Sequence, residues 1–67
     1  MAHKMTKRGN IDNIVTYEHF CDTKADMANI NPDEINLGSV CVVLVDESEG
    51  DTLQFYLAKS DKVWIKV

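Results

Sequence analysis

The chain has 67 residues and a formal net charge of −4 at pH 7, so it contains one domain at most. A core of this size contributes only about 3–5 kcal/mol, and domains this small usually need a disulfide, a metal or a partner subunit as well. The two cysteines, Cys21 and Cys41, adjoin apolar residues and are interpreted as buried, reduced thiols. The cysteines and histidines also lack the spacing of a zinc site. Oligomerisation is therefore the expected source of the additional stability that this domain needs.

The charge is divided unevenly along the chain. Residues 1–10 contain Lys4, Lys7 and Arg8 and no acid, whereas all eleven acids lie in the remainder. We interpret residues 1–10 as a flexible basic arm that attaches to a larger assembly, the alternative being a disordered, solubilising terminus. Residues 11–67 are the expected domain. Its acidic character argues against nucleic acid as a partner. No membrane span or signal peptide is recognisable, and a soluble protein made in a reducing cytoplasm is expected.

Three short sequence patterns after residue 10 predict local secondary structure. Residues 11–20 are rich in β-branched and aromatic residues, which favours an edge strand or a strand that pairs with another chain. Thr23 and Asp26 match a capping box, which predicts a short helix over about residues 24–29. The dipeptide Asn31-Pro32 predicts one further helical turn.

The C-terminal half carries three segments of strand length. Residues 39–45 are apolar on both faces, and residues 53–58 and 63–67 alternate. Gly50, in the loop between the first two segments, permits the backbone conformation that a hairpin requires. The short connections predict an antiparallel meander of three to four strands. The predicted fold is therefore mainly β with a short helix, in the form of a small antiparallel meander with an N-terminal arm.

A strand that is apolar on both faces needs cover on both sides. So short a chain supplies cover for one side, and the other side is predicted to contact a partner subunit in a dimer or trimer. We assign the core to Val40, Val42, Leu44, Leu53, Phe55, Leu57 and Ile65. We assign the subunit interface to Val43, Val45, Tyr56 and Trp64.

Candidate sites for chemistry have weak support in the sequence. The acidic loop over residues 46–51 lacks the spacing of a calcium loop and is interpreted as a solvated hairpin loop. His19 and Cys21 share a face of a strand, but no oxyanion hole or third catalytic group accompanies them, so we expect no enzyme. No cofactor or metal is expected either. The alternative function is a small monomeric binding module that reads carbohydrate or acts as an adaptor through Tyr56 and Trp64.

Several phrases of the sequence resemble one family. They are residues 8–10 (RGN), 15–20 (VTYEHF), 22–27 (DTKADM), 37–44 (LGSVCVVL) and 53–64 (LQFYLAKSDKVW). Together they resemble short virion structural or accessory proteins of tailed bacteriophages of gut bacteria, of the head-fibre or capsid-associated type, over residues 8–66. The resemblance implies a non-enzymatic, multimeric part of the virion that contacts capsid or other virion proteins and is assembled in the host bacterial cytoplasm. It brings no catalytic or cofactor residues with it.

Overall fold

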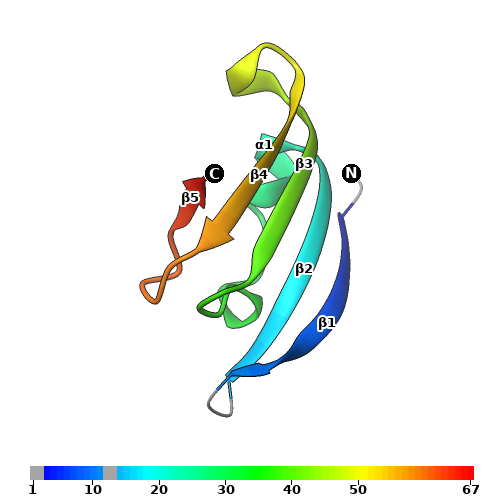
Figure 1. The fold of residues 1–67 in the computed structure, drawn as a ribbon. Helices are drawn as coiled ribbons and strands as arrows, with labels where there is room; N and C mark the ends of the chain where they lie inside the picture. The colour runs from blue at the N-terminus through cyan, green and yellow to red at the C-terminus, as the bar shows by residue number, and fades with distance from the viewer. Residues whose placement is uncertain (1–2, 12–13) are drawn as a thin grey trace.

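A computed structural model describes residues 3–11 and 14–67 of the chain. Its five strands form one mixed sheet in the order β1-β2-β3-β4-β5 (Figure 1). The strands are β1 (His3–Ile11), β2 (Ile14–Thr23), β3 (Val40–Asp46), β4 (Thr52–Ala58) and β5 (Trp64–Lys66). The helical segments are α1 (Lys24–Met27) and two 3-10 turns, η1 (Pro32–Glu34) and η2 (Glu47–Glu49). The protein is thus mainly β with one short helix, as the sequence predicts.

The local signals for helices and turns are confirmed. Thr23 Oγ1 accepts a hydrogen bond from the Asp26 N–H at 3.2 Å, and the Asp26 carboxylate accepts one from the Thr23 N–H at 3.3 Å, which completes the capping box. Asn31 Oδ1 accepts the Asp33 N–H at 3.0 Å and caps η1. Gly50 adopts a left-handed φ of 71° where η2 ends and the chain turns into β4.

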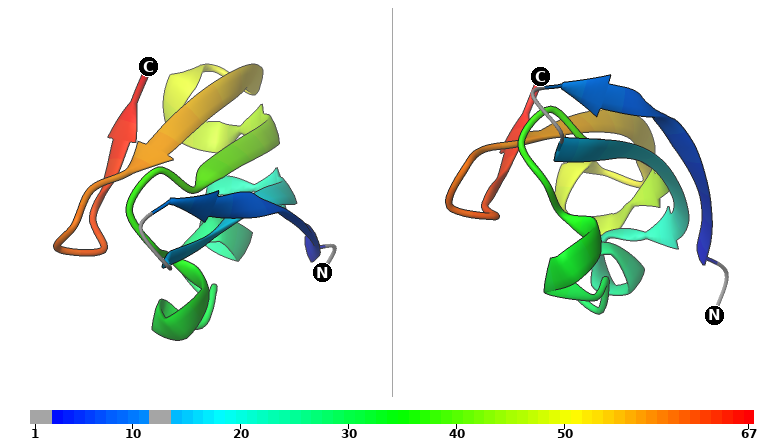
Figure 2. Two further views of the ribbon diagram at one scale, coloured as in Figure 1. Left: turned by 60° about the horizontal axis from the view of Figure 1, so that its bottom comes forward. Right: turned by 90° about the horizontal axis from the view of Figure 1, so that it is seen from below.

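The strand connectivity differs from the prediction. β2 and β3 are parallel, whereas the β1–β2, β3–β4 and β4–β5 pairs are antiparallel. The predicted all-antiparallel meander is therefore wrong at one connection. Residues 24–39 form a crossover between β2 and β3, which is long enough for a parallel pair. This crossover contains α1 and η1 and covers one side of the sheet (Figure 2).

The predicted flexible arm is a strand where the structure describes it. Residues 3–11 pair antiparallel with β2, so residues 3–10 belong to the same sheet as the rest of the domain. Residues 1–2 lie outside the described part. The strand escaped the sequence analysis because it makes main-chain bonds without presenting an apolar row. Met5, its one large apolar residue with a described side chain, is 38% exposed.

The core lies between the sheet and the crossover, on what we call the inner face. Its buried apolar residues are Cys21, Met27, Ile30, Ile35, Cys41, Val43, Tyr56 and Ala58. Cys21 and Cys41 are free thiols whose Sγ atoms lie 3.7 Å apart, which confirms the prediction of buried, reduced cysteines. Burial raises the pKa of both thiols, which makes them poor nucleophiles.

Candidate functional site

The outer face of the sheet, opposite the crossover, carries a continuous apolar surface. The strand register aligns Phe20, Val42 and Phe55 in one row across β2, β3 and β4. The next row continues from β3 through β4 into β5. We call the apolar members of this surface the outer-face residues: Phe20, Val40, Val42, Leu44, Leu53, Phe55, Leu57 and Ile65. The six that are leucine, isoleucine or phenylalanine are each 36–52% exposed.

This finding reverses the assignment of the two faces made from the sequence. Val43 and Tyr56, predicted at a subunit interface, are buried within the chain at 0% and 4% exposure. Trp64 packs half-buried against the same core. Val45 is 45% exposed and lies near the end of β3, where the register with β4 is irregular. The seven residues predicted to form the core are all outer-face residues, so that prediction is wrong.

The covered face combines three small residues with larger ones such as Tyr56 and Val43. Cys21, Cys41 and Ala58 are small and line the inner face, where they leave room for the side chains of the crossover. Met27 and Ile30 from the crossover fill that space and are buried. The outer face carries leucines and phenylalanines in the equivalent alternate positions. The apolar pattern of β3 is the same on both faces, so it did not distinguish them.

Two hollows occur on this side of the molecule. One, of about 510 Å³, is lined by Leu37, Leu57, Ala58, Lys59, Ser60, Ile65, Lys66 and Val67. The other, of about 240 Å³, is lined by Lys4, Phe20, Asp22 and Leu44. The charged residues of both sets are lysines or an aspartate beside the outer-face residues. Lysines and an aspartate therefore lie beside the apolar surface at these two hollows.

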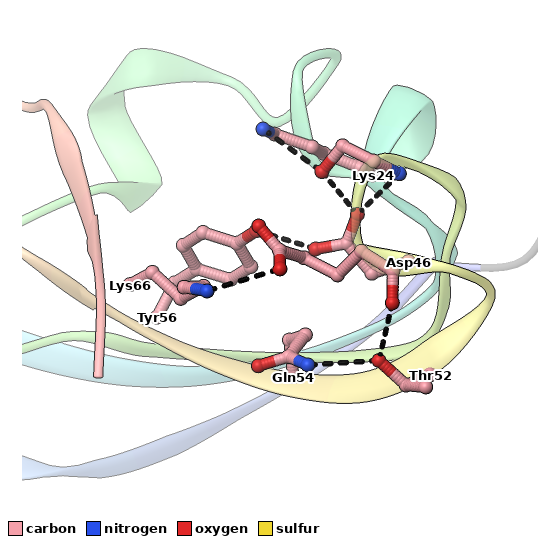
Figure 3. Close-up of polar contacts among 8 residues, drawn as sticks. Lys24, Asp46, Thr52, Gln54, Tyr56 and Lys66 are labelled. Atoms are coloured by element: carbon pink, nitrogen blue, oxygen red, sulfur yellow. Dashed lines mark hydrogen bonds and ion pairs between the residues drawn. The ribbon is translucent and has the colours of Figure 1, made fainter.

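A polar network occupies the inner side of the same sheet (Figure 3). The fully buried carboxylate of Asp46 accepts hydrogen bonds from the Tyr56 hydroxyl, from Ser48 Oγ at 2.6 Å and from the Ser48 N–H at 2.9 Å. Burial opposes ionisation of Asp46, but the hydrogen bonds from Ser48 and Tyr56 outweigh it and lower the pKa. Burial and the bond to Asp46 raise the pKa of Tyr56 to about 12. The pair is therefore a carboxylate and a neutral phenol, which the sequence analysis missed.

The acidic loop is more structured than a solvated hairpin loop. The Glu47 carboxylate accepts the backbone N–H groups of Lys24 at 2.8 Å and Ala25 at 3.1 Å, so it caps α1 from across the fold. Hydrogen bonds from backbone amides, its own and then those of Lys24 and Ala25, lower the pKa of Glu47. Glu49 pairs with Lys66 at 3.1 Å. Across the described residues, no group of three or more His, Cys, Asp or Glu side chains is placed to hold a metal ion.

His19 and Cys21 do not form a nucleophile–base pair. His19 is buried, and its Nε2 donates to the Glu34 carbonyl at 2.7 Å. Its Nδ1 lies 2.8 Å from Nε2 of His3, and the two rings stack at 5.0 Å. Burial is the main cause that lowers the pKa of His19. The Cys21 sulfur contacts Cys41, so the two predicted partners are engaged elsewhere.

The remaining predicted site residues are placed as follows. Lys4 and Lys7 are exposed on β1, and Arg8 belongs to β1, with its side chain outside what the structure describes. Tyr56 is buried, so it does not form an exposed stacking platform with Trp64 for a sugar. In the described residues, no helix has the length and apolar character needed to cross a membrane.

Comparison of the chain with protein-family models, with curated proteins and with solved structures gave no match.

Proposed function

We propose that this protein is a non-enzymatic assembly subunit that binds a second copy of itself through the outer face. The observation that carries the proposal is the apolar surface that spans four strands and leaves six large side chains 36–52% exposed. Contiguous apolar patches of this kind are uncommon on monomeric proteins and mark interaction sites. The proposal keeps the shared core expected from the sequence and places it on the opposite face of β3.

The charge distribution favours a second copy as the occupant. The protein has a net charge of −4, so two copies repel each other at most orientations. The outer-face residues are uncharged, and a two-fold pairing of this face with itself brings apolar side chains together without opposing like charges at its centre. Glu18, Asp22 and Lys4 stand on the same side at the border with β1, where charges of both signs form a rim.

An interface of ordinary size would occupy a modest share of the surface of this chain. A standard interface covers about 800 Å² on each partner, which is about a fifth of the 4260 Å² that this chain exposes. Phe20 and Phe55, aligned with Val42 in the central row, supply aromatic anchors of the type that dominates binding energy. The second copy also adds the apolar burial that a small domain lacks.

The resemblance to phage virion proteins supports a narrower version of this proposal. The subunit is then a head-fibre or capsid-associated component that assembles as a dimer or trimer in the bacterial cytoplasm and becomes part of the virion. Capsid and portal genes beside its own gene are the expected result. A gene neighbourhood without virion genes would contradict the placement in a virion and leave the outer-face proposal standing.

The test of the outer face is sedimentation velocity of the full chain over a range of micromolar concentrations. The wild type is expected to sediment as a dimer or trimer, and Leu57→Asp as a monomer, because the new carboxylate would be buried without a partner. Val63→Asp is the control: Val63 is 51% exposed and lies in the connection between β4 and β5, outside the strands that form the outer face.

Circular dichroism of both variants checks that the fold is retained. A wild type that stays monomeric throughout the range refutes the proposal. Loss of association in Val63→Asp with retention in Leu57→Asp would move the interface to the connection between β4 and β5.

A further inference from the structure

β1 forms one edge of the sheet and leaves its outward main chain without a neighbouring strand. It is the first strand in the order β1-β2-β3-β4-β5 and is nine residues long, whereas the opposite edge, β5, has three residues. An edge of that length presents a row of N–H and C=O groups to which a further strand can pair. The register shifts between Lys7 and Gly9, so the regular part of the edge is residues 3–7.

The side chains of this edge are exposed and basic. Lys4, Thr6 and Lys7 are exposed, and Met5 is 38% exposed. The sequence of β1 contains two lysines and one arginine and no acid, while the chain carries eleven acids after it. The positive charge is therefore concentrated on the strand that has a free edge.

This charge disfavours a second copy at the edge. An antiparallel pair of two β1 strands centred on Lys4 or on Lys7 would set that lysine against its own copy, and like charges opposite each other destabilise a strand pair. Addition of β5 from another copy would bring Lys66 to the same place. Lysines on an edge are a common protection against self-pairing, and here they leave the edge open to a strand of opposite charge.

We propose that β1 is a strand-addition site for an acidic, extended segment of a different protein. Main-chain hydrogen bonds to residues 3–7 supply the pairing. Lys4 and Lys7 lie on opposite faces of β1, so carboxylates three residues apart on the incoming segment lie beside them. This site is separate from the outer face, because it uses the edge of the sheet and selects by charge. It goes beyond the self-association proposed above and does not depend on it.

The test uses the full chain and two blocked hexapeptides of valine, one with glutamate and one with lysine at the second and fifth positions. The glutamate peptide is expected to shift the ¹H–¹⁵N resonances of residues 3–7 and to protect amides of β1 from hydrogen exchange. Its affinity is expected to fall with rising salt. The lysine peptide is expected to cause neither change. Equal binding of the two peptides refutes the charge selection.

Variants locate the site. Lys4→Glu combined with Lys7→Glu is expected to weaken the glutamate peptide about tenfold or more. Lys59→Glu is the control, because it makes the same type of charge change at an exposed lysine in the β4–β5 connection. If Lys59→Glu weakens binding as much per charge, or if the shifts map to the outer-face residues, the site is not β1. The neutral pair Lys4→Gln and Lys7→Gln, expected to give an intermediate loss, replaces the charge reversal if that variant does not fold.

Discussion

The two faces of the sheet differ in how far they are covered by the rest of the chain, although β3 is apolar on both. The inner face carries small residues, a buried histidine and a buried aspartate, and the crossover covers it. The outer face carries leucines and phenylalanines, and these side chains are 36–52% exposed. Apolar character alone therefore does not decide what is buried within the chain. The face that fits its cover becomes the core, and the other becomes available for association.

The largest loss of stability is expected from a charge placed at the centre of the inner face. Val43→Asp is expected to abolish cooperative unfolding, because an unpaired buried carboxylate costs several kcal/mol and a domain this small has only about 3–5 kcal/mol to lose. Thermal and denaturant scans by circular dichroism are the measurement. Val45→Asp, the same change two residues along β3 at an exposed side chain, is expected to stay within about 0.5 kcal/mol of wild type. Equal losses would contradict the assignment of faces.

A smaller loss of stability is expected at the start of α1, the first segment of the crossover that covers the inner face. Thr23→Ala removes the side chain that caps α1, and a loss of about 1 kcal/mol, within 0.5–2 kcal/mol, is expected in urea unfolding. Thr6→Ala on the exposed edge β1 is the control and should change stability by less than about 0.5 kcal/mol. If both variants lose the same stability, the Thr23 cap does not stabilise the crossover.

The inner face is also expected to respond to pH through His19. Burial lowers the pKa of His19 below its unfolded value of about 6.5, so the unfolded chain binds the proton more readily. The contribution to stability is therefore complete above about pH 6.5 and declines as the pH falls through the folded-state pKa. Denaturant midpoints measured between pH 8 and pH 5 test this, and His19→Gln should flatten the dependence. If the pH dependence of the denaturant midpoint is unchanged in His19→Gln, that dependence arises from other groups.

The smallest expected loss of stability comes from removing the ion pair between Glu49 and Lys66. Glu49→Gln removes the exposed ion pair with Lys66, and a loss below about 1 kcal/mol is expected, decreasing with added salt. Chemical denaturation at low and high salt is the measurement. A loss comparable to that of Thr23→Ala would mean that this pair has a larger structural role than its exposure indicates.

The sequence predicted the parts of the fold that depend on neighbouring residues. The capping box of Thr23 and Asp26, the cap at Asn31 and the left-handed Gly50 each act over a few residues, and each is confirmed. The three C-terminal strands were also predicted, because residues 39–45 form a short apolar run and the two later segments alternate, with turn residues between them. The β1 strand was missed, since its pairing with β2 depends on the main chain and leaves no apolar pattern.

The sequence predicted that one face of β3 would stay uncovered within the chain but assigned this to the wrong face. A strand with two apolar faces correctly indicated that one face would remain uncovered. The choice between faces depends on side-chain volumes across strands far apart in the sequence, such as Cys21 and Ala58, and periodicity does not report volume. Small residues at alternate positions near the crossover were the available signal. Neither the contact of Asp46 with Tyr56 nor that of His3 with His19 has a local sequence pattern.

The parallel pair of β2 and β3 has a consequence for the order in which the sheet forms. β3, β4 and β5 are joined by short connections, so their pairing is local and closes small loops. β2 reaches β3 only after residues 24–39 have ordered as a crossover, and non-local pairing of this kind is slow. We expect the C-terminal meander to form early and the docking of β2 to limit the rate. The inner face would then be completed last, and a nascent chain would expose apolar residues on both sides of β3 until it is.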